Sequence, residues 1–197
     1  VKRIKINPPL AFPEKVKEVS NLLSNAKKPV LVVGGQVHIA TSSRKLVEKV
    51  AKVHNLPVLC TYEHQDIISN DNLHYAGELG LRPPEPIRKN ALEADLVLVV
   101  GHRFNGVPNM AYKFPSSKQM FIHVIPDPNT IGKIFRTDMG IVADSENFLE
   151  QLLKFAKHNS NVERNEWVNL CHYRYLNNDA TLSPKNANDG LDLSLIH

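Results

Sequence analysis

Short apolar runs alternate along this chain with longer segments in which apolar residues recur every three or four positions. A continuous, β-branched apolar run is typical of a parallel strand that is covered on both faces. Such runs, or close variants of them, lie at residues 30–33, 58–61, 95–100, 120–125 and 140–142. We predict a strand at each of these places.

The segments with helical spacing predict the elements between these strands. Apolar residues share one helix face from Val16 to Ala26 and again from Leu46 to Ala51. Further helices are predicted over 86–93, from Asp144 or Ser145 to Leu153, and around Trp167, Leu170 and Cys171. Alternating strands and helices predict an α/β fold with three layers. We expect a mostly parallel sheet of five to six strands with helices on both faces, as in Rossmann-like and DHS-like NAD/FAD-binding domains.

Some segments have no clear periodicity. Residues 62–84 and 102–118 are irregular, and a loop as long as 62–84 is often functional. We interpret residues 1–12 as a lead-in linker, 13–176 as one domain, and the Asn-, Asp-, Ser- and Pro-rich stretch 177–197 as a linker to a further domain. We therefore expect this chain to be a piece of a longer polypeptide.

Composition narrows the function classes. The net charge of +4 is modest and its lysines and arginines are spread out, which argues against a nucleic-acid partner. No apolar run reaches the length of about 20 residues that a membrane helix needs, so no membrane partner is expected. Two cysteines are too few for a disulfide framework or a four-thiolate zinc site, and they indicate a reducing, cytoplasmic setting. The histidines show no metal-ligand spacing, so no metal site is expected in this chain.

The turn after the first predicted strand is the strongest candidate for chemistry. Gly34 and Gly35 follow the buried run directly and let the backbone approach a ligand closely. A strand, a glycine turn and a helix start form a seat for a phosphate. The full dinucleotide fingerprint is absent, and no acidic residue ends the next strand, so a tight turn in any α/β domain is the alternative. Thr61, Gly101 and Asp144 end other strands, where ligands of such sheets bind.

Several blocks of this sequence resemble a known family. They are residues 27–40, Ala94 to Asn105, His123 to Pro128 with Ile131 to Lys133, and Asp138 to Leu153. Over roughly residues 13–156 they resemble the central domain of thiamine-diphosphate-dependent enzymes of the acetolactate synthase-like kind. The resemblance implies an enzyme, a carboligase or decarboxylase acting on 2-oxo acids, whose N- and C-terminal domains hold thiamine diphosphate and Mg²⁺. It implies that this chain carries no catalytic residue and that the full-length protein is a homo-oligomer.

In flavin-containing members of that family the central domain holds FAD or ADP. The positions that this resemblance implies are Gly34, Gly35, Gln36, Thr61, Tyr62, Gly101, His102, Arg103, Asp144 and Ser145. Arg103 can pair with a phosphate as a planar fork, or form a surface ion pair instead. Asp144 can accept hydrogen bonds from ribose or adenine, or simply cap a helix.

Three departures from the family pattern concern this nucleotide. Residues 79–84 replace a Leu-Gly-Met-His-Gly stretch near the flavin ring with a sequence that contains two prolines. Ile125 stands where the family has an acidic residue, and residues 105–107 replace Asp-Asp-Arg. These changes favour another adenine nucleotide, or none, over FAD. A stand-alone nucleotide-binding module, such as an electron-transfer flavoprotein FAD domain or an NAD-dependent deacylase, is the alternative; the latter needs a zinc module for which two cysteines do not suffice.

Overall fold

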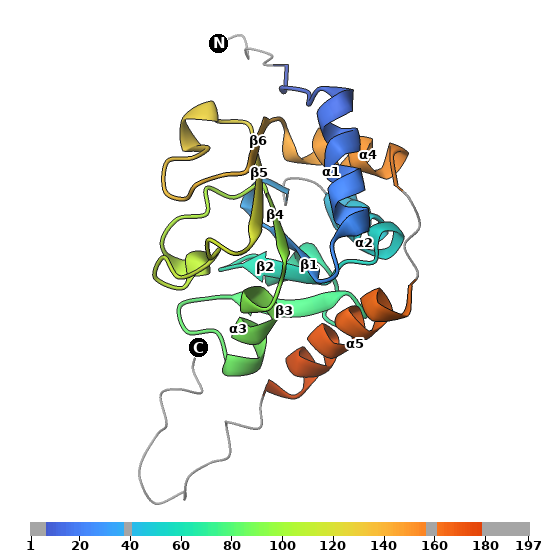
Figure 1. The fold of residues 1–197 in the computed structure, drawn as a ribbon, viewed down its shortest axis with the longest axis vertical. Helices are drawn as coiled ribbons and strands as arrows, with labels where there is room; N and C mark the ends of the chain where they lie inside the picture. Colours follow the sequence, from blue (N-terminus) through green and yellow to red (C-terminus); the bar gives the residue numbers. More distant parts are fainter. Residues whose placement is uncertain (1–6, 38–40, 157–160, 179–197) are drawn as a thin grey trace, which may run out of the picture.

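The computed structural model describes residues 7–37, 41–156 and 161–178, and shows one sheet between two layers of helices (Figure 1). The strands are β1 (Pro29–Val33), β2 (Val58–Thr61), β3 (Tyr75–Leu79), β4 (Leu96–Val100), β5 (Met120–Ile125) and β6 (Met139–Val142). The helices are α1 (Pro13–Asn25), α2 (Thr41–His54), α3 (Glu85–Leu92), α4 (Ser145–Lys154) and α5 (Val162–Leu176). Short 3-10 turns η1 (Gly35–Val37), η2 (Gln65–Ile67), η3 (Val107–Asn109) and η4 (Pro128–Thr130) lie between them.

The sheet is parallel throughout, in the order β3-β2-β1-β4-β5-β6. This is the strand order of Rossmann-type sheets, in which β2 and β3 are added on one side of β1 and the strands from β4 onward on its other side. We call the place where the strand order switches, between the carboxyl ends of β1 and β4, the reversal point. β1 and β4 lie side by side in the centre, and every residue of both is buried. The predicted fold class is confirmed.

Each face of the sheet has its own core. On one face, alternate strand residues such as Leu31, Leu98 and Val124 pack with apolar residues of α1, α2 and α4. On the other face, residues such as Val30 and Val97 pack with apolar residues of α3 and α5. Figure 1 shows α1, α2 and α4 together on one side of the sheet, and α3 and α5 next to each other near β3. The period-two alternation of buried strand residues explains why both layers are covered.

One strand was missed by the sequence prediction. The segment 62–84 was predicted to be a long loop, but it contains η2 and the strand β3. β3 reads Tyr-Ala-Gly-Glu-Leu and has no run of β-branched residues. Gly77 has a φ of 108°, and the pairing between β2 and β3 shifts in register beside it. This strand pairs with β2 at the sheet edge and packs against α3 and α5, and a local sequence pattern does not reveal these contacts.

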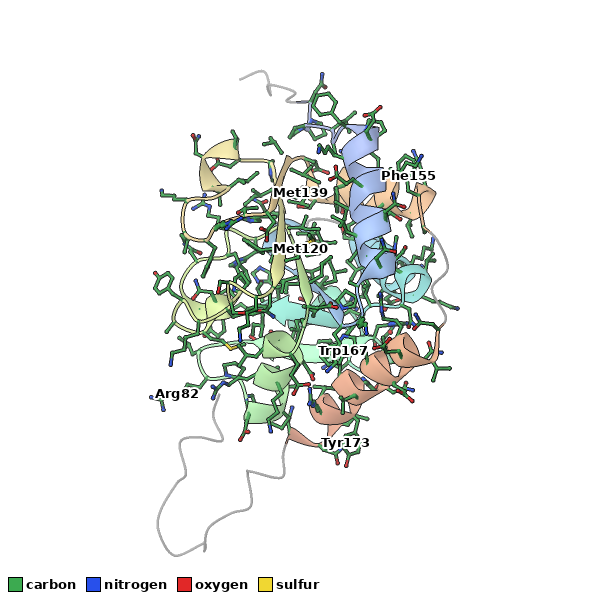
Figure 2. The ribbon with its side chains drawn as sticks, viewed as in Figure 1. Arg82, Met120, Met139, Phe155, Trp167 and Tyr173 are labelled. Atoms are coloured by element: carbon green, nitrogen blue, oxygen red, sulfur yellow. The ribbon has the colours of Figure 1, made fainter. Side chains whose placement is uncertain are left out.

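The last helix is fixed by two side chains that point into the domain. Arg164 is 1% exposed and its guanidinium donates to the carbonyls of Leu23, Ala26, His54 and Asn55, at the C-terminal ends of α1 and α2. The indole N–H of Trp167 donates to the Pro29 carbonyl over 2.9 Å. Figure 2 shows Trp167 on the side of α5 that faces the sheet, whereas Tyr173 points away from it.

The two predicted linkers are only partly described. Of the lead-in segment, residues 7–12 are described; Ala11 is buried, and the backbone N–H of Asp144 donates to the Pro9 carbonyl over 2.8 Å. This part therefore packs on the domain. Nearly all of the predicted linker 177–197 lies outside the described residues. Within the described ranges, no helix is both long and apolar enough to cross a membrane.

Candidate functional site

The reversal point of the sheet is closed by close contact between the ends of β1 and β4. The N–H of Gly34 donates to the Val100 carbonyl over 3.1 Å, and the N–H of Gln36 donates to the Gly101 carbonyl over 3.0 Å. A Cβ on Gly34 would overlap the Cβ of His102. Glycine is therefore needed here because two backbones meet, which is the property that a ligand-binding turn of this fold requires.

His64 covers the second glycine of the turn. Its ring lies where a Cβ on Gly35 would stand, and its Nδ1 lies 2.6 Å from the Tyr62 carbonyl oxygen. Thr61 is fully buried, with its hydroxyl 3.5 Å from the same nitrogen, while Tyr62 is 40% exposed. The end of β2 thus reaches the glycine turn of β1, as predicted for strands whose carboxyl ends meet. His64 itself was not among the predicted site residues.

Two buried polar atoms at this point have no hydrogen-bond partner among the described residues: Gln36 Oε1 and Ser145 Oγ. Ser145 is 1% exposed and stands at the start of α4. A Cβ on Gly101, which has a φ of 73°, would lie 2.8 Å from Ser145 Oγ. An unpaired buried hydroxyl costs free energy unless a ligand or water pairs with it. Gln36 Oε1 and Ser145 Oγ are therefore the atoms of this region with which a ligand or a water molecule can pair.

Asp144 caps a helix, which was the alternative to a nucleotide contact for this residue. Its carboxylate accepts from the Asn147 N–H over 3.0 Å and so caps α4. One carboxylate has more lone pairs than this bond uses, so a contact with a nucleotide stays a prediction.

Two histidines near the site, His102 and His123, have lowered pKa values. His102 Nδ1 accepts from the Phe104 N–H over 2.8 Å, and His123 Nε2 lies 2.8 Å from the His102 carbonyl oxygen. Burial, followed by the charges of His64, His123 and Arg103, lowers the pKa of His102 to about 4. Burial also lowers the pKa of His123. Near pH 7 the rings of His102 and His123 therefore add no positive charge to this region.

Arg103 faces a cavity of about 280 Å³ beside the end of β5. The cavity is lined by Arg103, Asn105, Asp127, Asn129, Thr130, Lys133 and Ile134. The other nine predicted site residues do not line it. The structure therefore divides the predicted site into the reversal-point group and a separate group around Arg103. The sequence pattern did not predict this cavity: residues 126–133 contain polar side chains but only one cation, Lys133, and one anion, Asp127.

The described part of the chain has no cluster of metal-ligating side chains. Among the described residues, no group of three or more His, Cys, Asp or Glu side chains is placed to hold a metal ion. Both cysteines, Cys60 and Cys171, are free and buried, and burial strongly raises the pKa of each thiol.

Fold and site together define a Rossmann-like α/β domain with a glycine turn at its reversal point. Comparison with known proteins identifies the family. The family model described as "Thiamine pyrophosphate enzyme, central domain" matches residues 16–152. The chain belongs to this family, and the resemblance stated from the sequence is confirmed.

The relatives that match are much longer enzymes. The chain is 31% identical over 147 residues to acetolactate synthase isozyme 3 large subunit of Escherichia coli K12, covering 74% of this chain and 25% of that protein. It is 28% identical over 172 residues to glyoxylate carboligase of Escherichia coli O157:H7, covering 84% and 29%. Benzoylformate decarboxylase of Polynucleobacter necessarius has the same fold, with a TM-score of 0.63 at 22% identity over 81% of this chain and 30% of the other. The chain thus spans between a quarter and a third of these proteins.

Proposed function

We propose that this chain is the central, non-catalytic domain of a thiamine-diphosphate- and Mg²⁺-dependent carboligase or decarboxylase that acts on 2-oxo acids. The observation that carries this proposal is the family match over residues 16–152, in relatives of which the chain covers only about a quarter. Carboligase, synthase and decarboxylase all occur among the names of the matching proteins. The same match favours this reading over a stand-alone nucleotide-binding module.

Thiamine diphosphate would be held outside this chain, by domains of the same polypeptide. When bound, it supplies an electron sink for the negative charge that develops at the substrate's keto carbon when the bond to the carboxylate breaks. The described residues of this domain provide a rigid spacer, because two cores fix the sheet on both faces. We propose homo-oligomeric assembly and a cytoplasmic location for the full-length protein, which sedimentation and cell fractionation test.

We further propose that the reversal point of the sheet holds an adenine nucleotide, with ADP preferred over FAD. The backbone amide of Gly35 would meet the diphosphate, since the Gly34 N–H is already bonded to Val100, and Ser145 Oγ would donate to the diphosphate or to the ribose. The fit is supported by the unpaired Ser145 Oγ and Gln36 Oε1 and by the glycine turn itself. The His64 ring must rotate away from Gly35, which its half-exposed position on a turn permits.

A pair of experiments tests the two parts separately. For the enzyme, the full-length protein is assayed for CO₂ release and carboligation from 2-oxo acids with and without thiamine diphosphate and Mg²⁺. Cofactor-independent activity, or none with any 2-oxo acid, contradicts the assignment. For the nucleotide, ADP and FAD are titrated into the chain by calorimetry, and the absorbance of the gel-filtered full-length protein is recorded. One tightly bound flavin per subunit would contradict the preference for ADP.

Ser145→Ala is the most informative variant for the nucleotide. It removes a hydroxyl that has no partner in the described protein, so the stability of the free chain should not fall. ADP affinity should fall roughly fivefold or more, the equivalent of about 1 kcal/mol. Ser116→Ala, which changes an exposed hydroxyl in the loop before β5, is the matched control and should leave ADP affinity unchanged.

A further inference from the structure

The cavity around Arg103 has walls from two loops that both leave the carboxyl ends of central strands. Arg103 and Asn105 come from the loop after β4, whereas Asn129, Thr130 and Lys133 come from the loop after β5. Figure 1 shows both loops, in yellow-green and yellow, on the side of β5 opposite α1 and α4. The cavity has about 280 Å³, close to the lower end of the range for small-ligand sites.

The wall formed by the loop after β4 is held in place by a buried aromatic residue, Phe104. Phe104 is buried between the two cavity residues Arg103 and Asn105, with a positive φ of 53°. Its ring packs on the rings of Phe121 and Phe135, at centroid distances of 5.8 and 6.1 Å. Because Phe104 is held in the core, its neighbours on either side are presented to the cavity. Backbone strain of this kind gathers at ligand sites when the surrounding packing maintains it.

The second wall is fixed by Asp127. Its carboxylate accepts from the Asn129 N–H over 3.0 Å and from the Thr130 hydroxyl over 3.0 Å, which shapes η4. These bonds, more than the charge of Arg103, lower the pKa of Asp127. Phe135, two residues after Lys133, packs on Phe121 and so holds the far end of this loop. Asp127, the one acidic residue that lines the cavity, thus already accepts hydrogen bonds from its own loop.

The charge of the cavity is left unbalanced. Arg103 and Lys133 are both exposed, and neither forms an ion pair or hydrogen bond within the described part of the chain. Asn105 and Asn129 add amide N–H groups beside them. A guanidinium presents a planar fork to an oxyanion, whereas an ammonium acts as a point charge. Asp127 keeps its negative charge while it accepts bonds from its own loop, so the cavity has a net positive charge, and its two cations and two amide groups suit an oxyanion with several acceptor oxygens.

We propose that this cavity binds the phosphate or diphosphate group of a small phosphorylated ligand, held between Arg103 and Lys133. The inference does not rest on the nucleotide proposed at the reversal point, because no residue of the reversal-point group lines this cavity. A phosphate is favoured over a single carboxylate because it carries more charge and more acceptor oxygens for the amide groups of Asn105 and Asn129.

The test uses the 197-residue chain and pyrophosphate as the probe. Calorimetric titration at low ionic strength should give saturable binding with a Kd below roughly 1 mM, weakened by added salt. Arg103→Gln and Lys133→Gln should each weaken binding roughly tenfold or more, as expected for loss of a charge-assisted hydrogen bond. Asn105→Asp, which is nearly isosteric and adds a negative charge, should weaken it comparably without a folding penalty. Arg88→Gln and Lys118→Gln remove exposed cations outside the cavity and should change nothing.

Titrations with ADP and with succinate identify the ligand class and separate this site from the reversal point. Binding of ADP that depends on Lys133 but not on Ser145 would show that the phosphate comes from a nucleotide here. Binding of pyrophosphate and not ADP would show a non-nucleotide phosphate. Succinate, a dicarboxylate, should bind at least tenfold more weakly than pyrophosphate. Absence of saturable pyrophosphate binding, or equal affinity in the wild type and in the Arg103→Gln Lys133→Gln double variant, overturns the proposal, and neither result bears on the Ser145→Ala test.

Discussion

Replacing Arg164 with methionine removes a buried cation while keeping a side chain of similar length. In the structure this guanidinium donates hydrogen bonds to carbonyls at the ends of two helices. Nη2 donates to Leu23 and Ala26, and Nη1 donates to His54 and Asn55. Without it, four carbonyls at the negative ends of α1 and α2 lose a charged donor. Desolvation by burial lowers the pKa of Arg164 to about 10, which shows that burying the charge has its own cost.

The two effects can be weighed. Hydrogen bonds to a charged group contribute about 1.5–3 kcal/mol each, and the two from Nη2 are the shorter pair. Removing the buried guanidinium also removes the cost of its desolvation, which offsets part of the loss of these hydrogen bonds. We therefore expect the free energy of unfolding to fall by about 3 kcal/mol. Arg164→Lys, which keeps one charged donor, should lose less.

Urea unfolding followed by tryptophan fluorescence measures this change directly. Trp167 is the single tryptophan of the chain, is 2% exposed, and lies one turn after Arg164 on α5. For an m-value near 2 kcal/mol/M, the midpoint should move by roughly 1.5 M. Arg88→Met, on the exposed side of α3, is the control and should stay within about 0.5 kcal/mol of the wild type. A midpoint shift for Arg164→Met as small as that of the control would refute the reasoning.

Four other outcomes are expected. Stability should rise with pH between about 4 and 6.5, because His102 binds its proton more weakly when folded (pKa about 4) than when unfolded; His102→Gln should flatten this slope, and curves that stay parallel would contradict it. Gly101→Ala should destabilise the chain by about 1–3 kcal/mol, by circular dichroism, since its φ is 73° and a Cβ would press on Ser145; a neutral result would show that the turn adapts. Trp167→Phe should lower the free energy of unfolding by about 1–2 kcal/mol through loss of the bond to Pro29, with Tyr173→Phe as an exposed control. Calorimetry should show no thiamine diphosphate binding to this chain with Mg²⁺; saturable binding tighter than millimolar would contradict the domain assignment.

Strands with buried, β-branched runs could be predicted from the sequence because their pattern is local. β1 and β4 are fully buried and were located from this pattern to within about one residue. β3 could not be found in this way, since Gly77 and Glu78 give it no strand pattern and distant helices supply its burial. The helix start at Ser145 followed from the capping residue Asp144, which is also a local signal.

The sequence allowed the backbone segments of the candidate site to be predicted, but not the directions of its long side chains. That strand ends converge follows from parallel topology alone, and it brings Gly34, Gly101 and Ser145 together. The direction of a long side chain is decided by what packs beside it. Arg103 lines a cavity with residues from the next loop because Phe104 is anchored in the core, and His64 covers Gly35 because of its bond to Tyr62. No spacing along the chain encodes these contacts.

The stretch recognised by sequence comparison and the stretch that folds together are of different lengths. The family match ends at residue 152, yet Trp167 and Cys171 of α5 complete the core on one face of the sheet. A polypeptide cut just after the matched segment would leave the edge strand β3 and the apolar side of α3 uncovered, and exposed apolar edges of this kind favour aggregation. Any isolated version of this module should therefore extend through Leu176, because its minimal independently folding unit is defined by packing and not by similarity.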